Sequence, residues 1–379
     1  MDLFVILADA GRASLGPIAA MYALAAIGLN LHFGYTGLLN FGQVAFMLVG
    51  AYGVAVTVAV FDGPLWLGVL AGLGAAVVLA LLLGIPTLRL RADYLAIATI
   101  AAGEVLRIVF NAGFARPLTG GVFGLQQFAG AFYALNPIPP GLYGVGRLTF
   151  SDRDIWVMIV GWGAVAVATL GIYLLVRSPW GRVLRAVRDD EEAARSLGKN
   201  VYAYKMQSLI LGGVLGALGG MVLAIDAQAV TPNTFNPVVT FYLYTLLILG
   251  GAGTVLGPVV GSVLFWFLLL LVESTLRQAV GAGYIPPELI QPADVGALRF
   301  ALVGLALILL LVFRPAGILG SAEEMRLEAG AAGGRRRPMR ACRCWTSATW
   351  RSAAASVARV GASARACASA CSWLSVAGR

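Results

Sequence analysis

Charged side chains are scarce in this chain of 379 residues, because only 12% of its residues are Asp, Glu, Lys or Arg. Soluble globular domains carry roughly 25%. Hydrophobic residues make up 59% of the chain, and the mean hydropathy is +0.85. So little polar surface cannot coat a water-soluble globule. The composition therefore excludes that class and predicts an integral membrane protein.

The apolar residues fall in runs of roughly 17–25, the length that crosses a bilayer as a helix, without the alternation of barrel strands. We expect an all-α fold, a polytopic transmembrane helical bundle of about nine spans with a range of eight to ten. The expected spans lie at about 14–33, 39–60, 65–88, 93–111, 154–176, 207–228, 238–252, 256–272 and 298–313. The seventh and eighth could instead form one long broken element.

Orientation follows from Lys and Arg in short connections, which favour the cytoplasmic side. Three basic segments fall on the same side under this span count: Arg89 with Arg91, the segment 177–205, and Arg314 with 335–337. We therefore expect 177–205 and the C-terminus in the cytoplasm and the N-terminus outside. The Gly/Pro-rich segment 112–153 then lies outside.

Residues that carry enzyme chemistry are also missing. His32 is the only histidine, and all four cysteines (Cys342, Cys344, Cys367 and Cys371) lie beyond residue 320. There is no H-E-x-x-H or G-x-S-x-G, and Gly198-Lys199 lacks the rest of a nucleotide-binding P-loop. We expect no enzymatic activity, no metal site and no cofactor in this chain.

The net charge of +9 lies mostly at the end of the chain. Residues 321–379 hold ten Arg and three Glu, whereas residues 1–320 hold 17 basic and 15 acidic residues. We therefore expect a transmembrane domain at 1–320 and a basic, low-complexity tail at 321–379. The tail is either the product of a shifted reading frame or a disordered segment that touches anionic membrane lipid.

Polar residues inside the expected spans are candidates for a translocation path, because such residues are costly in lipid and mark function. They are Asn30, Asn40, Gln43, Glu104 and Arg107. Glu104 and Arg107 are three residues apart on a helix and could instead form a structural pair.

Small residues at four-residue spacing predict helix packing faces. These are Gly212, Gly216 and Gly220 in one set, and Gly253, Gly257 and Gly261 in another. The glycine-rich run Gly250–Pro258 is either a turn between spans or part of a pathway.

One connection contrasts with the rest of the chain. The segment 177–205 gathers seven Lys or Arg and four acidic residues, which indicates a docking surface. Within it, Glu192-Ala193-Ala194-Arg-Ser-Leu-Gly198 matches the E-A-A-x-x-x-G core of the cytoplasmic loop in permease subunits of ATP-binding-cassette importers. No Pro follows Gly198, so the general importer pattern is only partial.

Further motifs narrow the resemblance. Five segments carry this narrower resemblance. They are Gly34-Tyr-Thr-Gly-Leu-Leu-Asn-Phe-Gly-Gln-Val-Ala-Phe46, Leu88-Arg-Leu-Arg-Ala-Asp-Tyr-Leu-Ala-Ile-Ala-Thr99, Gly103-Glu-Val-Leu-Arg-Ile108, Leu118-Thr-Gly-Gly121 and Phe313-Arg-Pro-Ala-Gly-Ile-Leu-Gly320. In these segments the chain resembles the branched-chain amino acid permease family, specifically its M-type subunit. This resemblance covers most of 15–320. It implies import of branched-chain or related small amino acids by alternating access across a bacterial inner membrane.

The same resemblance implies partners: an H-type permease subunit, two cytoplasmic ATPase subunits that bind ATP and Mg, and an extracytoplasmic solute-binding protein, with no nucleic acid. It also implies that 177–205 couples the spans to the ATPases. The candidate coupling residues are Arg188, Glu191, Glu192, Ala193, Ala194, Arg195 and Gly198. The alanines would allow close approach, the charges would set registry, and Gly198 would end a short helix at positive φ. Alternatives are a urea or short-amide importer, an ion-driven secondary transporter, or a membrane enzyme.

Overall fold

The computed structural model describes residues 3–90, 92–145, 148–281 and 317–320, with isolated helical positions between 296 and 308. The expected tail at 321–379 lies outside the described residues, so the predicted domain boundary at residue 320 stays a prediction. The same holds for most of the ninth expected span at 298–313.

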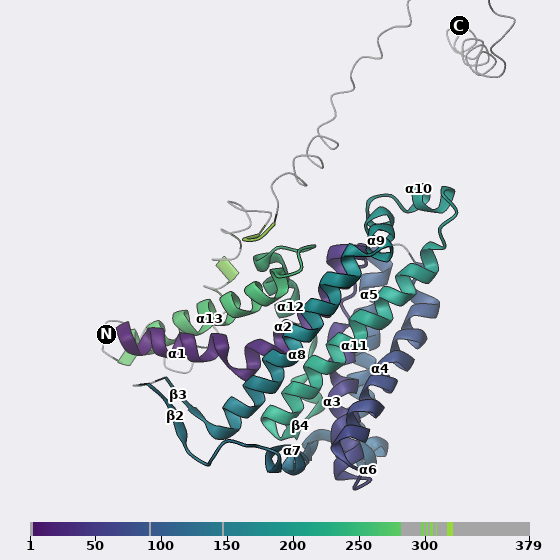
Figure 1. The fold of residues 1–379 in the computed structure, drawn as a ribbon. Coiled ribbons are helices and arrows are strands. Elements are labelled where there is room, and N and C mark those ends of the chain that lie inside the picture. The colour runs from purple at the N-terminus through teal and green to yellow at the C-terminus, as the bar shows by residue number, and fades with distance from the viewer. Residues whose placement is uncertain are drawn as a thin grey trace, which may run out of the picture. The chain divides into compact units, whose positions relative to one another are not determined.

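Helices dominate the described chain (Figure 1). The first half contains α1 (Leu3–Leu15), α2 (Pro17–Asn30), the π-helical turn η1 (Leu31–Tyr35), α3 (Gln43–Ala59), α4 (Leu65–Thr87) and α5 (Ala92–Asn111). The second half contains α8 (Asp152–Arg177), α9 (Pro179–Asp189), α10 (Glu191–Ser196), α11 (Val201–Ala227), α12 (Pro237–Gly250) and α13 (Gly257–Gly281). The expectation of a helical bundle is met.

Short elements fill the end of the bundle opposite α9 and α10 (Figure 1). They are η2 (Gly113–Ala115), α6 (Arg116–Thr119), η3 (Gly121–Phe123), β1 (Leu125–Gln126), α7 (Gly130–Ala134), β2 (Leu142–Val145), β3 (Leu148–Ser151), β4 (Ala229–Val230) and η4 (Pro232–Thr234). β1 pairs antiparallel with β4, Leu125 opposite Val230, and β2 pairs antiparallel with β3, Leu142 opposite Ser151. These strands are small additions to an otherwise helical chain.

The expected count of nine spans is not reached in the described residues. Five helices there are long and apolar enough to cross a membrane: α2 with η1, α4, α8, α11 and α13. A sixth arises if α5 and the short helices after it, bent by 63°, count as one span. α3 has 17 residues and α12 has 14, so both are shorter than a full crossing of about 20 residues.

Two differences from the sequence expectation involve charged residues in helices. α1 was not predicted as a separate helix, because Asp9 and Arg12 interrupt its apolar pattern. α13 continues to Gly281, whereas the expected span stopped at 272, before Glu273 and Arg277. These two residues form an i,i+4 ion pair of 2.8 Å on the helix surface. The charges that ended the apolar run therefore stabilise the helix that continues through them.

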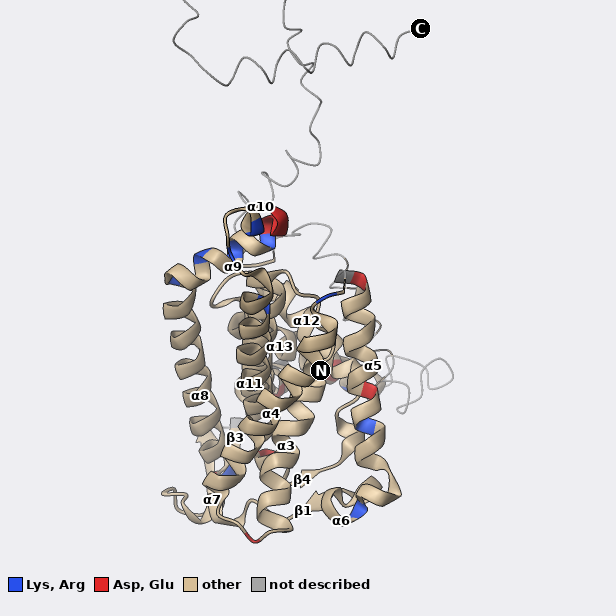
Figure 2. Ribbon diagram, turned by 90° about the vertical axis from the view of Figure 1, so that its right-hand side faces the viewer, with Lys and Arg blue, Asp and Glu red and all other residues tan. Residues whose placement is uncertain are grey.

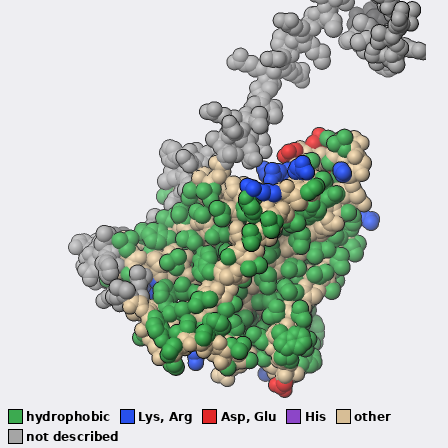
Figure 3. All heavy atoms as spheres, viewed as in Figure 1, with side chains coloured by type: hydrophobic (Ala, Val, Ile, Leu, Met, Phe, Trp, Pro, Cys, Tyr) green, Lys and Arg blue, Asp and Glu red, His purple; other side chains and the backbone are tan. Residues whose placement is uncertain are grey.

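α2 is the central helix of the bundle. Every residue from Ala19 to Asn30 is buried, and α2 packs against α8, α11, α12 and α13. Five alanines and a glycine in this stretch leave room for neighbouring helices to approach closely. The outer surface is covered instead by large apolar side chains (Figure 3), as expected for contact with lipid.

The glycine faces show where helices approach most closely. A Cβ at Gly212 would lie less than 3.0 Å from Gly28 O and the His32 ring, and one at Gly220 would lie equally close to Met47 backbone atoms. A Cβ at Gly216 would meet Gln43 Nε2 at 2.5 Å. This face of α11 therefore packs on α2 and α3.

The second glycine set is only partly as expected. Gly257 and Gly261 lie on α13, where an added Cβ would meet backbone oxygens of Gly251 and Leu246. Gly253 does not share their helix face, because it lies in the 251–256 turn with a φ of +79°. The glycine-rich run thus forms a turn that separates α12 from α13, and a positive φ at Gly253 explains the glycine there.

Candidate functional site

The connection between α8 and α11 folds as two short helices, α9 and α10, at one end of the bundle. Figure 2 shows that charged residues gather there, while the ribbons of α8 and α11 carry few along their length. α8 ends because Ser178 is extended, with a ψ of 169°, and Pro179 then begins α9. Leu184 and Val187 are buried, whereas Arg182 and Arg185 are exposed. α9 is therefore an amphipathic helix that lies on the bundle.

α10 is stabilised at both ends by its own residues. Asp190 Oδ1 accepts hydrogen bonds from the backbone N–H groups of Glu192 (2.9 Å) and Ala193 (3.0 Å), as an N-cap does. After the helix, Gly198 has a φ of +74°, and its N–H donates to Arg195 O at 2.9 Å. The positive φ expected at Gly198 is observed. α10 is thus a defined short helix rather than an irregular loop.

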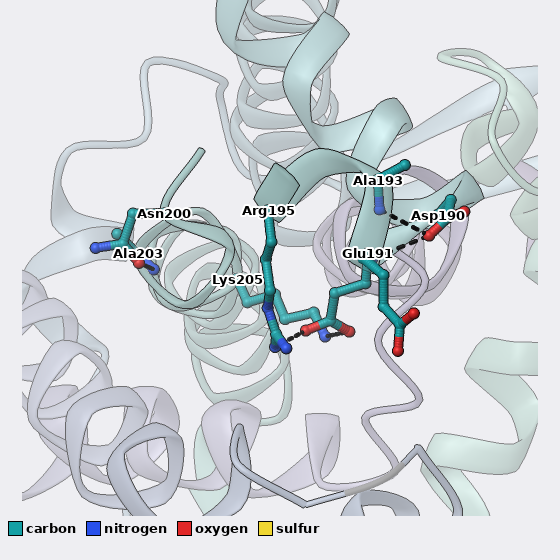
Figure 4. A network of polar contacts seen from close by, with 8 residues as sticks. Asp190, Glu191, Ala193, Arg195, Asn200, Ala203 and Lys205 are labelled. Atoms are coloured by element: carbon teal, nitrogen blue, oxygen red, sulfur yellow. Dashed lines mark hydrogen bonds and ion pairs between the residues drawn. The ribbon is translucent and has the colours of Figure 1, made fainter. Parts of the chain in front are cut away.

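Glu191 joins α10 to α11, as Figure 4 shows. One carboxylate oxygen accepts from Arg195, four residues later on the same helix, and the other accepts from Lys205 Nζ at 2.6 Å. The Lys205 side chain is only 16% exposed, so water screens this pair less than it screens Arg195. Glu191 therefore holds α10 against α11, whereas the Arg195 side chain is 63% exposed.

The two alanines face opposite ways. Ala194 is buried with Val187 and Val201, so it packs α10 against α9 and α11 and does not offer a surface to a partner. Ala193 is exposed, as are Glu192 and Gly198. Leu197 is 78% exposed at the tip of the connection. Sequence reasoning missed Leu197, because a single apolar residue in a polar segment is common on protein surfaces and gives no signal by itself.

Arg188 contacts the membrane domain, although it was expected in the docking set. Its guanidinium donates to Gly34 O of η1 and lies beside Gly253 of the α12–α13 turn. Asn30 links the same two segments: its Oδ1 accepts from Gly253 N at 2.9 Å, and its Nδ2 donates to Thr254 O at 2.8 Å. These contacts connect α9 to the central helix.

A second buried polar cluster joins α2, α3 and α11. Asn40 Nδ2 lies 3.1 Å from His32 Nδ1, and His32 Nε2 lies 3.3 Å from Leu209 O. Gln43 Nε2 donates to Ala25 O and Gly212 O. Asn30, Asn40 and Gln43 are each at most 1% exposed and have partners within the chain. Their expected role in a translocation path stays a prediction, whereas their role in joining helices is visible.

Glu104 and Arg107 form the expected pair on α5, through two guanidinium nitrogens. Arg107 Nη1 also donates to Asn233 Oδ1 of η4 at 2.8 Å, and Asn111 Nδ2 donates to the same oxygen at 3.1 Å. The pair therefore ties α5 to the segment after α11. Sequence reasoning missed Asn233.

A cavity of about 200 Å³ lies between the connection and the membrane domain. It is lined by Thr36, Gly37, Leu38, Leu88, Leu90, Leu95, Val187, Arg188, Glu191 and Lys205. Its walls come from the segment after η1, the α4–α5 connection, α9, α10 and α11. The cavity thus leaves a gap between part of the 177–205 connection and the membrane domain, while other residues of the connection contact that domain directly.

The chain was compared with known proteins. Residues 17–312 match the family model described as branched-chain amino acid transport system / permease component. The high-affinity branched-chain amino acid transport system permease protein LivM of Escherichia coli (strain K12) is 29% identical, over 86% of this chain and 74% of that protein. LivH of the same organism is 27% identical, over 81% and 93%. The nucleoside ABC transporter permease protein NupC of Lactococcus lactis is 30% identical, over 72% and 84%. The chain therefore belongs to the branched-chain amino acid transport system permease family, the membrane-spanning subunits of ATP-binding-cassette importers.

Proposed function

We propose that this chain imports branched-chain amino acids as the M-type permease subunit of an ATP-driven transporter. Its partners are an H-type permease, two ATPase subunits that bind ATP and Mg, and an extracytoplasmic solute-binding protein. The end of the bundle that carries α9 and α10 faces the cytoplasm. Similarity to both LivM and LivH supports a pair of related permeases.

The observation that carries this proposal is the exposed surface of α10 and the turn after it. Glu192, Ala193, Leu197 and Gly198 are all exposed there, and a Cβ at Gly198 would meet no atom within 4 Å. A large apolar side chain among small and charged neighbours suits insertion into a groove of another protein. We assign this surface to the ATPase.

The contacts beneath this surface give a route for force. When the ATPases close, movement of α10 reaches α11 through Glu191 and Lys205, which are 2.6 Å apart. Movement of α9 reaches η1 through Arg188 and Gly34. η1 continues α2, so the central helix of the bundle is linked to the docking surface. A π-helical turn at this joint suits a segment that changes its winding.

The coupling proposal is tested by co-purification of the ATPase subunits with the Leu197→Asp variant. A charge in the centre of an interface is expected to weaken binding by at least about tenfold, since hot-spot changes cost about 2 kcal/mol or more. Leu142→Asp is the matched control, because Leu142 is also 78% exposed but lies in β2 at the opposite end. Equal ATPase recovery with both variants, at equal permease levels, would refute the assignment.

The solute is tested by uptake of labelled leucine, valine, guanosine and urea in cells with and without the gene. Import of leucine or valine supports the proposal. A nucleoside importer is the second candidate, because NupC and the guanosine permease protein NupQ are also similar to this chain. Gene-dependent uptake of guanosine alone would establish that second candidate and reject the first.

A further inference from the structure

An apolar groove runs along the outer surface of α8, away from the docking surface of α10. Its volume is about 690 Å³, and its walls come from α8, the α12–α13 turn, the start of α13 and Leu319. The α8 wall extends from Trp162 to Tyr173 and includes Ala166 and Leu170. The opposite wall includes Val255 and Val259. The helix face around it is covered by hydrophobic side chains (Figure 3).

The groove is open at the surface that the described residues form. Leu170 is 59% exposed, and Leu256 and Leu319 are also exposed. The segment 317–320 reaches this place because Leu319 N donates to Gly250 O at 3.1 Å, at the end of α12. Gly317 turns the chain there with a φ of +72°. The groove is thus built from three segments distant in sequence, and its lining is mostly apolar, with hydroxyl groups at Thr169, Tyr173 and Thr254.

Cationic groups lie at one end of the groove. The Arg177 guanidinium stacks on the Tyr173 ring, 4.1 Å from its centroid, and Tyr173 lines the groove. The Arg185 guanidinium reaches the same end of α8, where Nη2 donates to Val176 O at 3.4 Å. In the described part of the chain, no carboxylate lies within ion-pair distance of either arginine. The site therefore combines an apolar slot with positive charge at its mouth.

The length of the groove indicates what fills it. Trp162 and Tyr173 are 11 residues apart on one helix, which is about 17 Å. One leaflet of the hydrocarbon core is about 15 Å thick, half of the whole core. The groove therefore matches the length of a lipid chain in one leaflet, and the cations at its end favour an anionic headgroup over the apolar face of a helix.

We propose that this groove binds one anionic phospholipid, with an acyl chain between α8 and α13 and the phosphate against Arg177. Arginine suits this role, because its planar guanidinium can bond two phosphate oxygens at once while it stacks on an aromatic ring. The lipid would bridge the end of α8, which leads directly into α9, and the α12–α13 turn beside Arg188. Lipid binding in this groove does not depend on which solute the protein transports.

The test is native mass spectrometry of the purified full chain with phosphatidylglycerol or phosphatidylcholine of identical acyl chains. The unmodified chain is expected to retain phosphatidylglycerol preferentially. Arg177→Gln is expected to weaken that retention about fivefold, the effect of one basic side chain beside anionic lipid. Arg153→Gln is the matched control, since Arg153 also stacks on a tyrosine, Tyr133, but lies at the opposite end of α8.

A second variant pair tests the groove itself. Ala166→Trp fills the slot and is expected to remove the bound lipid, whereas Val167→Trp adds the same ring to an exposed position outside the groove lining. Equal retention of the two lipids by the unmodified chain, or equal lipid binding by Ala166→Trp and Val167→Trp, would overturn the proposal. A dimer of this chain that Ala166→Trp disrupts would also overturn it, because the occupant would then be protein.

Discussion

Gly220 lies where α3 and α11 approach most closely, so Gly220→Ala is the sharpest test of the packing. An alanine Cβ would lie less than 3.0 Å from the Cα, C and O atoms of Met47. These are backbone atoms of a helix, so they cannot rotate away as a side chain could. The two helices must separate, and a gap of 0.5–1 Å already forfeits roughly a quarter to a half of each dispersion contact across it.

Overpacking of this kind costs about 1–3 kcal/mol. The unfolding entropy is about 2.1 cal/mol/K per residue, so a membrane domain of about 300 residues should lose about 2–5 °C in its unfolding midpoint. The assay is thermal unfolding of the purified protein in detergent. Gly171→Ala on α8 is the control, because a Cβ there would meet no atom within 4 Å. That change should leave the midpoint unchanged or raise it, since alanine favours the helix.

A midpoint for Gly220→Ala equal to that of Gly171→Ala would refute the reasoning. It would mean that α3 and α11 can separate without cost, and that the glycine face of α11 does not set the distance between helices. A lower midpoint for Gly171→Ala than for Gly220→Ala would also contradict the packing argument, because a Cβ at Gly171 has no neighbour to displace.

Three further changes test the polar contacts. Glu191→Gln should weaken the contacts to Arg195 and Lys205 by about 1 kcal/mol. Trypsin should therefore cut the 177–205 connection about fivefold faster in this variant than in the control Glu192→Gln. The Glu192 carboxylate makes no ion pair in the described residues. Asn40→Leu leaves His32 Nδ1 and Gly42 N without their partner and should cost about 2–4 kcal/mol in thermal unfolding; an unchanged midpoint would contradict the cluster's structural role. Arg107→Gln should lower the amount of inserted protein because Glu104 loses its charge partner, and Glu104→Gln added to it should restore that amount. If the restored double variant also transports normally, the pair is structural; if it inserts but does not transport, the pair lines the path.

Helix positions were predictable where a proline or charged residues marked the end of an apolar run. The expected 65–88, 93–111 and 154–176 differ by at most two residues at either end from α4, α5 and α8. Pro64 and the charged residues around 152–154 mark the beginnings of α4 and α8 in the sequence itself. Length was harder to predict, because α12 stops after 14 residues at a glycine turn, and α13 continues through Glu273 and Arg277.

The candidate site was predictable as a segment but not in its detail. Charge pattern and the match at Glu192–Gly198 located the connection, and the N-cap at Asp190 and the positive φ at Gly198 follow local rules. Which residues face outward depends on packing between α9, α10 and α11. Arg188 therefore turned out to contact Gly34, Ala194 turned out to be buried, and Leu197 was missed.

Composition and periodicity by themselves determined that this chain is a helical membrane protein, because a bilayer requires long apolar helices with satisfied backbones. Short motifs in the sequence identified its family and its docking connection. Only the tertiary structure decided that α2 is central, that Asn30 joins it to the α12–α13 turn, and that Arg177 lies at the mouth of an apolar groove. Such contacts join residues far apart in the sequence, 224 positions for Asn30 and Thr254, and no local pattern encodes that distance. The helices bring these residues together only once they have packed.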